Sequence, residues 1–303
     1  MEKLTVFTAT YNRAYCLPQL YQSLQKQTSK DFIWLVIDDG SEDNTKSLVE
    51  SWIAEKDLSI VYIYQENKGM LGAHNKGYEN IDTPLSVCID SDDFMPDDGV
   101  EKIINLWDSH GSNAYAGMVG LDIFKNGDVI GTKFPNNLKK ATFQELIDIH
   151  KVKGDKKYVY RTEVIRKYLP YPFFEGEKFP AQDYVYRQID QDYKLLVFNE
   201  VFCVVEYLPD GNSNNKITSY LKNPNSFAFY RLDRMKKAHS FSLRFKQAVH
   251  FVSSSIIANN KNFFGATEHK YTTMMALPFG YLLSLYLKNT KKKAGFNVPN
   301  KKV

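Results

Sequence analysis

The chain has 303 residues, of which 43% are hydrophobic and 24% are charged, and its three cysteines (Cys16, Cys88 and Cys203) form no CxxC pair. These proportions exclude a disordered or collagen-like chain, and the cysteine spacing excludes a disulfide scaffold and a cysteine-rich zinc site. The net charge of +4 is uneven, because residues 216–303 carry 16 Lys and Arg against two acidic residues. This basic end favours an anionic partner.

Strand-like and helix-like segments alternate over the first hundred residues. Short apolar and β-branched runs predict strands at 4–10, 32–37, 58–64 and 84–89. Apolar residues at helical spacing and turn signals predict helices at about 17–27, 45–56 and 69–78. Strands separated by helices of this length predict an α/β fold with a mostly parallel central sheet and helices on both faces.

The pattern beyond residue 100 is mixed and then becomes helical. Asn126-Gly127 predicts a tight hairpin turn. Short helices are expected at 142–150 and 163–168, an irregular loop at 171–180, and strands at 194–198 and 201–207. We divide the chain into an α/β domain, 1–225, and a helical, basic and aromatic extension, 226–303. The longest apolar stretch there, 274–287, has 14 residues, whereas a membrane span needs about 20.

Polar side chains follow three of the predicted strands. Tyr11-Asn12-Arg13 follows the first strand, Asp38-Asp39 the second, and Asp90-Ser91-Asp92-Asp93 the fourth. Ligands of an open parallel sheet bind outside the carboxyl ends of its strands. Clustered carboxylates at that edge suit Mg²⁺ or Mn²⁺, which prefer oxygen ligands. The residues alone leave open a second reading, in which such carboxylates cap helices, as Asp43 and Asp97 could.

Several other functional signatures are absent. Counting from Asp90, the sixth place of an EF-hand loop holds Met95 instead of Gly. Gly72 and Gly77 have the spacing of a phosphate-binding loop, but Tyr78 stands where Lys is required. No GxGxxG follows the first strand, and no GxSxG or HExxH is present. With no recognisable nucleic-acid module, we expect no nucleic-acid partner.

Four segments in order resemble the family 2 glycosyltransferases: Val6–Arg13, Val36–Thr45, Glu66–Gly77 and Cys88–Pro96, the last similar to the DXD motif of that family. The resemblance extends to bacterial capsule and exopolysaccharide enzymes. It implies a GT-A fold, a nucleotide-sugar donor and a Mn²⁺ or Mg²⁺ cofactor. It also implies that 1–100 forms the nucleotide-sugar-binding half and 101–225 the acceptor half of the catalytic domain.

The resemblance further implies a donor site. Its residues would be Thr8, Ala9, Tyr11, Arg13, Asp39, Gly69, Asn75, Asp90 and Ser91, with Asp92 as the metal ligand. Tyr11 would stack on the base, and Asp39 would accept the imide N–H of uracil, or of thymine. Asp90 would hold the ribose side of the donor. His74 stands where the family often has Arg, so it would either donate a hydrogen bond or pack.

The catalytic base would come from a later segment. The family usually places an acidic pair at the start of a helix after a loop, and Gln182-Asp183 stands there, with Gln in place of the first acid. Asp183 would therefore be the base of an inverting transfer. Glu175 and Glu177 in the preceding loop are further candidates. The alternative is that Asp183 only stabilises the first turn of a helix through the helix dipole.

The implied function is the transfer of a single sugar from a UDP-sugar to a glycan acceptor, lipid-linked, in bacterial cell-surface polysaccharide synthesis. A sugar nucleotidyltransferase and a catalytically inactive glycan-binding or scaffold module are the alternatives. The loop 207–215 reads as a flexible turn, or as a lid that orders over the diphosphate.

The aromatic and lysine-rich extension, 226–303, has two readings. It suits an anionic membrane surface, and it equally suits core helices or a homodimer interface. We therefore expect a cytoplasmic protein, with peripheral attachment to the inner face of the cell membrane as one reading.

Overall fold

The computed structural model describes residues 2–178, 181–206 and 216–294. The predicted lid, 207–215, lies outside these residues. The chain forms two compact units, one of Met1–Tyr171 with Gln182–Leu208 and one of Pro172–Ala181 with Pro209–Val303. The sequence placed the boundary at 225/226, whereas this division assigns 209–225 and the short segment 172–181 to the second unit.

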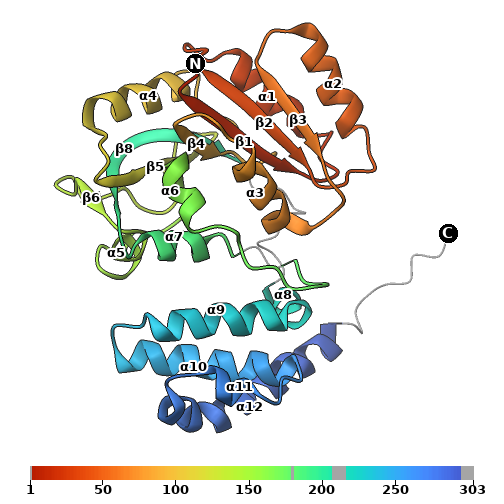
Figure 1. Cartoon of the computed structure of the whole chain (residues 1–303), viewed down its shortest axis with the longest axis vertical. Helices are drawn as coiled ribbons and strands as arrows, with labels where there is room; N and C mark the ends of the chain where they lie inside the picture. Colours follow the sequence, from red (N-terminus) through yellow and green to blue (C-terminus); the bar gives the residue numbers. More distant parts are fainter. Residues whose placement is uncertain (1, 179–180, 207–215, 295–303) are drawn as a thin grey trace. The chain divides into compact units, whose positions relative to one another are not determined.

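The first unit contains an eight-stranded sheet (Figure 1). Its strands are β1 (Leu4–Thr10), β2 (Phe32–Asp38), β3 (Ile60–Tyr64), β4 (Leu85–Cys88), β5 (Tyr115–Phe124), β6 (Lys140–Ala141), β7 (Lys156–Arg161) and β8 (Lys194–Val205). Their order is β3-β2-β1-β4-β7-β5-β8-β6. The pairings make β6 and β7 antiparallel to the other six strands. The predicted α/β fold with a mostly parallel sheet is confirmed.

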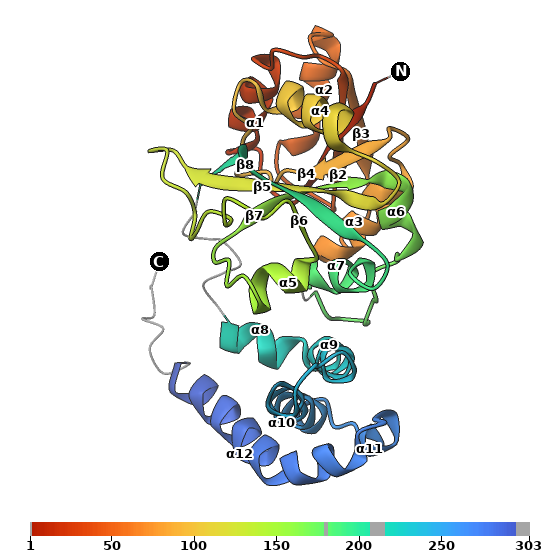
Figure 2. The same cartoon turned by 90° about the vertical axis from the view of Figure 1, so that its left-hand side faces the viewer.

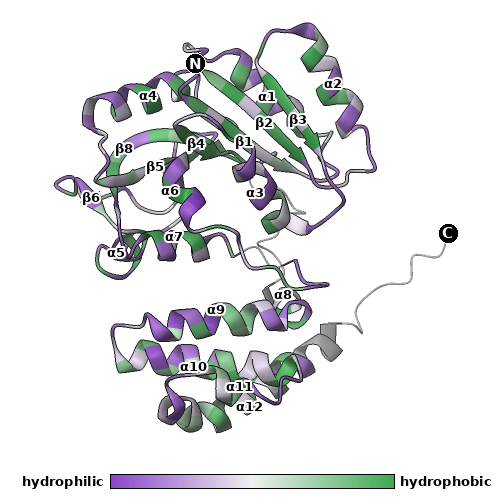
Figure 3. Cartoon of the chain, viewed as in Figure 1, coloured by the Kyte–Doolittle hydropathy of each residue, from purple (hydrophilic) through white to green (hydrophobic). Residues whose placement is uncertain are grey.

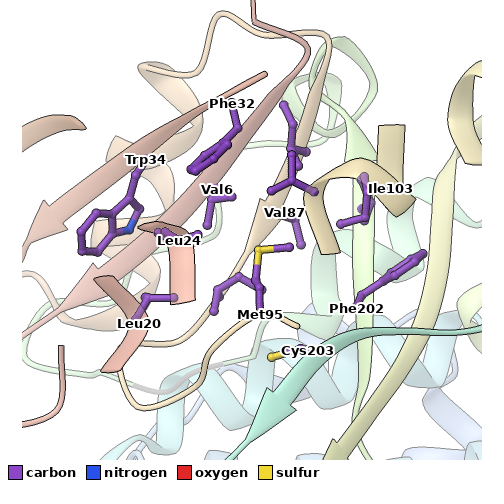
Figure 4. Packing of buried hydrophobic residues seen from close by; sticks show 14 of the residues in the cluster. Val6, Leu20, Leu24, Phe32, Trp34, Val87, Met95, Ile103, Phe202 and Cys203 are labelled. Atoms are coloured by element: carbon purple, nitrogen blue, oxygen red, sulfur yellow. The ribbon is translucent and has the colours of Figure 1, made fainter. Parts of the chain in front are cut away.

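Helices cover both faces of this sheet (Figure 2). One face carries α1 (Leu17–Gln25), α2 (Thr45–Glu55) and α4 (Gly99–His110), and the other carries α3 (Gly69–Glu79), α5 (Phe143–Asp148), α6 (Thr162–Lys167) and α7 (Asp183–Ile189). Successive strand residues point to opposite faces, so Val6 of β1 joins the first core and Phe7 joins the second. Figure 4 shows the first core, where Val6 and Trp34 pack with Leu20 of α1 and Ile103 of α4.

Some elements differ from the expectation. The sequence did not predict β6, β7, α4 or the first half of β5, and it predicted two strands where β8 is continuous. The gap between the two predicted strands falls at residues 199–200, where the pairing of β8 with β5 is irregular: Val119 pairs with Val197, and Leu121 pairs with Val201. The Asn199 side chain accepts from Phe134 N at 2.9 Å and donates to Phe134 O at 3.0 Å. A neighbouring backbone thus satisfies the polar side chain at this irregularity. The turn at Asn126-Gly127 forms as predicted, with Gly127 at φ +88°.

The second unit is helical, as predicted for the end of the chain. Its helices are α8 (Lys216–Lys222), α9 (Pro224–Lys236), α10 (Phe241–Ile257), α11 (Phe263–Ala266) and α12 (Lys270–Ala294). α10 packs between α9 and α12 around a core that includes Met235, Phe251 and Val252. Among the described residues, no helix has both the length and the hydropathy needed to cross a bilayer.

Candidate active site

The loops that follow β1 and β2 are tied together by hydrogen bonds. Asn12 adopts a left-handed backbone conformation, φ +53°, which asparagine tolerates better than most residues. Its N–H donates to Ser41 Oγ, and its side-chain oxygen accepts from Glu42 N, both at 2.8 Å. The first two motifs of the sequence therefore meet at the carboxyl edge of the sheet.

The loop after β4 joins the same edge, because β1 lies between β2 and β4. Arg13 Nη1 lies 3.9 Å from Asp92 Oδ2, which links the first motif to the DXD segment. Asp90 is exposed, Asp92 is half-buried and Ser91 is buried. Two carboxylates of the DXD segment thus remain accessible from solvent beside a guanidinium.

Asp39 connects the second motif to the third. Its buried Oδ1 accepts from Gln65 Nε2 at 2.7 Å and from the backbone N–H of Lys68 at 2.8 Å. Asp38 has a separate role in the turn, where it accepts from Ser41 N at 2.8 Å and from the Tyr62 hydroxyl at 2.6 Å. The carboxylate of Asp39 is therefore fixed at the entrance to α3.

α3 begins at Gly69 and holds two further predicted residues. Gly69 has φ +75°, a conformation that favours glycine. The Asn75 side-chain oxygen accepts from Tyr171 N at 2.7 Å, and its amide donates to Tyr171 O at 3.1 Å. Asn75 thus fixes the backbone at Tyr171. This residue ends the first of the two chain segments, Met1–Tyr171, that make up the sheet unit.

His74 packs in the core. It is 1% exposed and makes edge contacts with the rings of Phe7 at 5.1 Å and Tyr171 at 6.0 Å. Burial lowers its pKa to about 4, although the charge of Asp90 acts in the opposite direction. Of the two roles left open by the sequence, the structure supports packing by a neutral imidazole.

The residues of β1 and its loop divide between core and surface. Thr8 is fully buried, and its Oγ1 accepts from Trp34 Nε1 at 3.1 Å. Its side chain therefore contacts the core residue Trp34, and a role for Thr8 in lining the nucleoside pocket stays a prediction. Ala9 is half-buried, and the Tyr11 ring is 47% exposed, which leaves that ring available for stacking.

Asp183 stands in the first turn of α7. Its Oδ2 accepts from Arg187 Nε at 3.0 Å, and the Arg187 guanidinium lies over the ring of Phe143, 5.3 Å from the centroid. The neighbouring Gln182 places its amide nitrogen 3.3 Å from both His74 Nε2 and Met70 Sδ. The start of α7 therefore packs against α3, the helix that begins beside Asp39. Sequence reasoning missed Arg187, although its i,i+4 spacing from Asp183 was a usable signal.

The two other candidate bases differ in their surroundings. Glu175 is exposed. Glu177 is buried and accepts from the backbone N–H groups of Asn225 at 2.8 Å and Ser226 at 2.7 Å. A carboxylate there satisfies free donors at the N-terminus of α9 and interacts favourably with the helix dipole. Glu177 is thus a structural residue of the second unit, and we no longer consider it a candidate base.

A buried lysine lies behind the DXD segment. Lys157 of β7 places Nζ 3.7 Å from Asp93 Oδ2, and Asp93 also accepts from Glu206 N at 3.2 Å. Asp122 of β5 is buried, and burial raises its pKa to about 6, although the charge of Lys157 opposes the shift. The sequence did not reveal Lys157 because its strand was not predicted.

Replacing Lys157 by Met is expected to lower the free energy of unfolding by about 3–5 kcal/mol, because Asp93 and Asp122 would remain buried without their cation. Urea unfolding followed by circular dichroism measures this loss. Lys139→Met is the matched control, since Lys139 is exposed. Equal stability of the two variants would show that Lys157 does not compensate the buried carboxylates.

The carboxylates at this edge of the sheet suit a metal site whose ligands come partly from the protein and partly from the substrate. Within residues 2–178, 181–206 and 216–294, no three His, Cys, Asp or Glu side chains converge into a metal site built from protein alone. Mg²⁺ and Mn²⁺ often use only one or two carboxylates and take their other ligands from water and substrate phosphates. The accessible oxygens of Asp90 and Asp92 fit that kind of site.

Three bacterial proteins are similar to parts of this chain. A teichoic acid poly(glycerol phosphate) polymerase of Staphylococcus epidermidis is 33% identical over 96 residues, which are 31% of this chain and 13% of that protein. Glycosyltransferase GlyA of Streptococcus pneumoniae is 34% identical over 102 residues, 34% of this chain and 14% of that protein. A GalNAc(5)-diNAcBac-PP-undecaprenol beta-1,3-glucosyltransferase of Campylobacter jejuni is 35% identical over 97 residues, 31% of each. The matches thus span less than a third of these relatives.

Solved structures share the fold at low sequence identity. Staphylococcus aureus TarS 1-349 in complex with UDP-GlcNAc matches with a TM-score of 0.62 at 18% identity, over 91% of this chain and 80% of that one. The mannosyltransferase PcManGT of Pyrobaculum calidifontis, in complex with GDP-Man and Mn²⁺, matches with a TM-score of 0.56 at 15% identity, over 94% and 87%. The family model described as glycosyl transferase family 2 matches residues 5–169, more than half of the chain. The chain therefore belongs to glycosyl transferase family 2.

Proposed function

We propose that this protein is an inverting, metal-dependent glycosyltransferase that moves one sugar from a UDP-sugar to a lipid-linked glycan acceptor in bacterial cell-surface polysaccharide synthesis. The observation that carries the proposal is the continuous set of contacts at one edge of the sheet. Asn12 joins Ser41, Arg13 approaches Asp92, and Asp39 holds the entrance to α3. Gln182 then joins α3 to the start of α7, so segments far apart in the sequence meet.

The donor would lie across the loops after β1, β2 and β4. The exposed ring of Tyr11 would stack on the base, and Asp39 would accept the imide N–H of uracil. Arg13, Asp90 and Ser91 would lie along the ribose and diphosphate, with Gly69 and Asn75 shaping the opposite wall and Ala9 the floor. The structure of TarS with UDP-GlcNAc supports a uridine donor for a protein of this fold.

The reaction would be a single displacement at the anomeric carbon. The acceptor hydroxyl would attack as the nucleoside diphosphate leaves from the opposite face, which inverts the configuration. Asp183 would remove the hydroxyl proton, and the ion pair with Arg187 at 3.0 Å would hold the carboxylate in one orientation.

Asp92 would hold the divalent cation together with the donor diphosphate, with Asp90 beside it. The cation supplies charge neutralisation for the leaving diphosphate. PcManGT with GDP-Man and Mn²⁺ supports such an ion in this fold. The Campylobacter relative, named for a PP-undecaprenol substrate, supports the lipid-linked acceptor.

A donor-hydrolysis screen tests the proposal. The purified chain is incubated with UDP-Glc, UDP-GlcNAc, UDP-Gal, GDP-Man or dTDP-Glc, with Mn²⁺ or Mg²⁺, and the released nucleotide is measured. We expect release of UDP from one UDP-sugar and no release in EDTA. Pyrophosphate formation from UTP and a sugar 1-phosphate would instead identify a nucleotidyltransferase, and binding without turnover of any donor would indicate an inactive glycan-binding module.

A further inference from the structure

The exposed face of α12 is formed by large hydrophobic side chains. Figure 3 shows hydrophobic residues recurring along this helix. The exposed side chains are Tyr271, Met274, Met275, Phe279, Tyr281, Leu282, Leu285 and Tyr286, with exposed fractions between 40% and 83%. Most of them recur at intervals of three and four residues, so they form one stripe along the helix. Exposed apolar patches of this kind commonly mark an interaction site.

The opposite face of α12, which packs on α10, includes several small side chains. Thr273 and Ala276 are fully buried. A Cβ at Gly280 would lie 2.5 Å from a side-chain carbon of Val252 in α10, so the two helices approach closely there. α12 therefore buries small residues together with Leu287, while eight large hydrophobic side chains remain outside. A helix that only covers the core of a water-soluble unit carries mainly polar residues on its outer face.

The patch extends onto the start of α10. Phe279 of α12 makes an edge contact with Phe245 of α10, with 5.6 Å between ring centroids, and Phe245 stacks on Phe241 at 6.1 Å. Phe241 is itself 56% exposed. Aromatic residues from two helices of the same unit thus continue one surface, which we call the α12 patch: the eight α12 side chains named above together with Phe241.

Charge decides which partner fits the α12 patch. Lys270 begins α12 and Lys288 lies near its end, both exposed, and Lys291-Lys292-Lys293 follow in the sequence. Residues 270–294 include no acidic residue. A second copy packed through α12 would bring lysines against lysines in either orientation, because both ends of the helix are basic. Anionic phospholipid headgroups complement the same charges.

The side-chain types also match a bilayer surface. Tyrosine is enriched where apolar and aqueous regions of a membrane meet, and the α12 patch contains Tyr271, Tyr281 and Tyr286. Lysines at the ends of such a helix can extend to the headgroups while the apolar residues enter the acyl boundary. We propose that the α12 patch lies in the plane of a bilayer surface rich in anionic phospholipid. The proposal concerns the helical unit alone and does not depend on sugar transfer.

Vesicle flotation of the full chain, without any donor, tests this inference. We use vesicles of phosphatidylcholine alone and of phosphatidylcholine mixed equally with phosphatidylglycerol. We expect the full chain to float with the anionic vesicles and not to float with the neutral ones. Leu282→Ser with Tyr286→Ser should lower partitioning at least about tenfold. Lys270→Gln with Lys288→Gln should lower it about fivefold for each lysine.

Ile149→Ser is the matched control, because Ile149 is an equally exposed hydrophobic residue of the sheet unit, 67% exposed, and it should leave flotation unchanged. Analytical ultracentrifugation of the same proteins measures their oligomeric state and so tests the alternative partner, a second copy of the chain. The proposal would be overturned if the full chain formed a concentration-dependent dimer and did not bind vesicles, and if the Leu282→Ser/Tyr286→Ser variant lost that dimer. The patch would then be assigned to a second copy of the chain. Equal binding to neutral and anionic vesicles, or no binding to either, would overturn it as well.

Discussion

Replacing Asp183 by Asn is expected to reduce sugar transfer by about 10²–10⁴-fold, the range in which a general base contributes. Asparagine keeps the size of the side chain but cannot accept the proton of the acceptor hydroxyl. Binding of UDP should be unchanged, because no predicted donor contact involves this residue. Initial rates of transfer at saturating donor, together with calorimetric titration of UDP, separate the chemical step from binding.

Two controls make this result specific to the base. Asp183→Asn also removes the ion pair between Asp183 Oδ2 and Arg187 Nε, which are 3.0 Å apart. Arg187→Gln removes this ion pair but retains the carboxylate, so it should lose less activity than Asp183→Asn. Asp82→Asn makes the same charge change at a side chain that is 96% exposed and should have no effect. Near-complete activity of Asp183→Asn would show that the proton is taken by another group.

Replacing Asp92 by Asn is expected to remove metal-dependent donor binding and to lower turnover by about 10²-fold or more. A cation at a leaving group supplies several kcal/mol of charge stabilisation, and about 1.4 kcal/mol corresponds to a tenfold change in rate. The variant should fold normally, because Asp92 is half-buried at the carboxyl edge of the sheet and lies outside both cores. Titration of UDP with and without Mn²⁺, and turnover in each condition, measure the effect.

Asp97→Asn is the matched control for this variant. It neutralises an exposed carboxylate five residues along the same loop and should retain metal-stimulated binding. Turnover of the original chain that continues undiminished in excess EDTA would contradict metal dependence. Metal-stimulated binding that survives in Asp92→Asn would instead move the metal ligand to another carboxylate.

Much of the site could be predicted because its residues follow strands in short motifs. Asp39, Asp90 and Asp92 directly follow buried strands, and parallel strands bring their carboxyl ends to one edge. The contact of Arg13 with Asp92 follows from strand order, since β1 lies between β2 and β4.

Other site residues could not be assigned from their types or spacing. Thr8 and His74 lie within matching motifs, yet both face the core, because the direction of a side chain depends on register and packing. Glu177 has the residue type of a base, but its partners, the N–H groups of Asn225 and Ser226, lie about 50 residues away in the sequence and become neighbours only when α9 folds.

The sequence by itself determined the alternation of strands and helices in the first hundred residues, the four motifs, and the basic helical end. These depend on local periodicity and on the order of residues along the chain. Only the tertiary structure placed β7 between β4 and β5 and buried Lys157 beside Asp93. It also showed that eight large hydrophobic side chains of α12 lie on its exposed face. Pairing between distant strands and the choice of which helix face is covered depend on partners far along the chain, and local periodicity does not specify them.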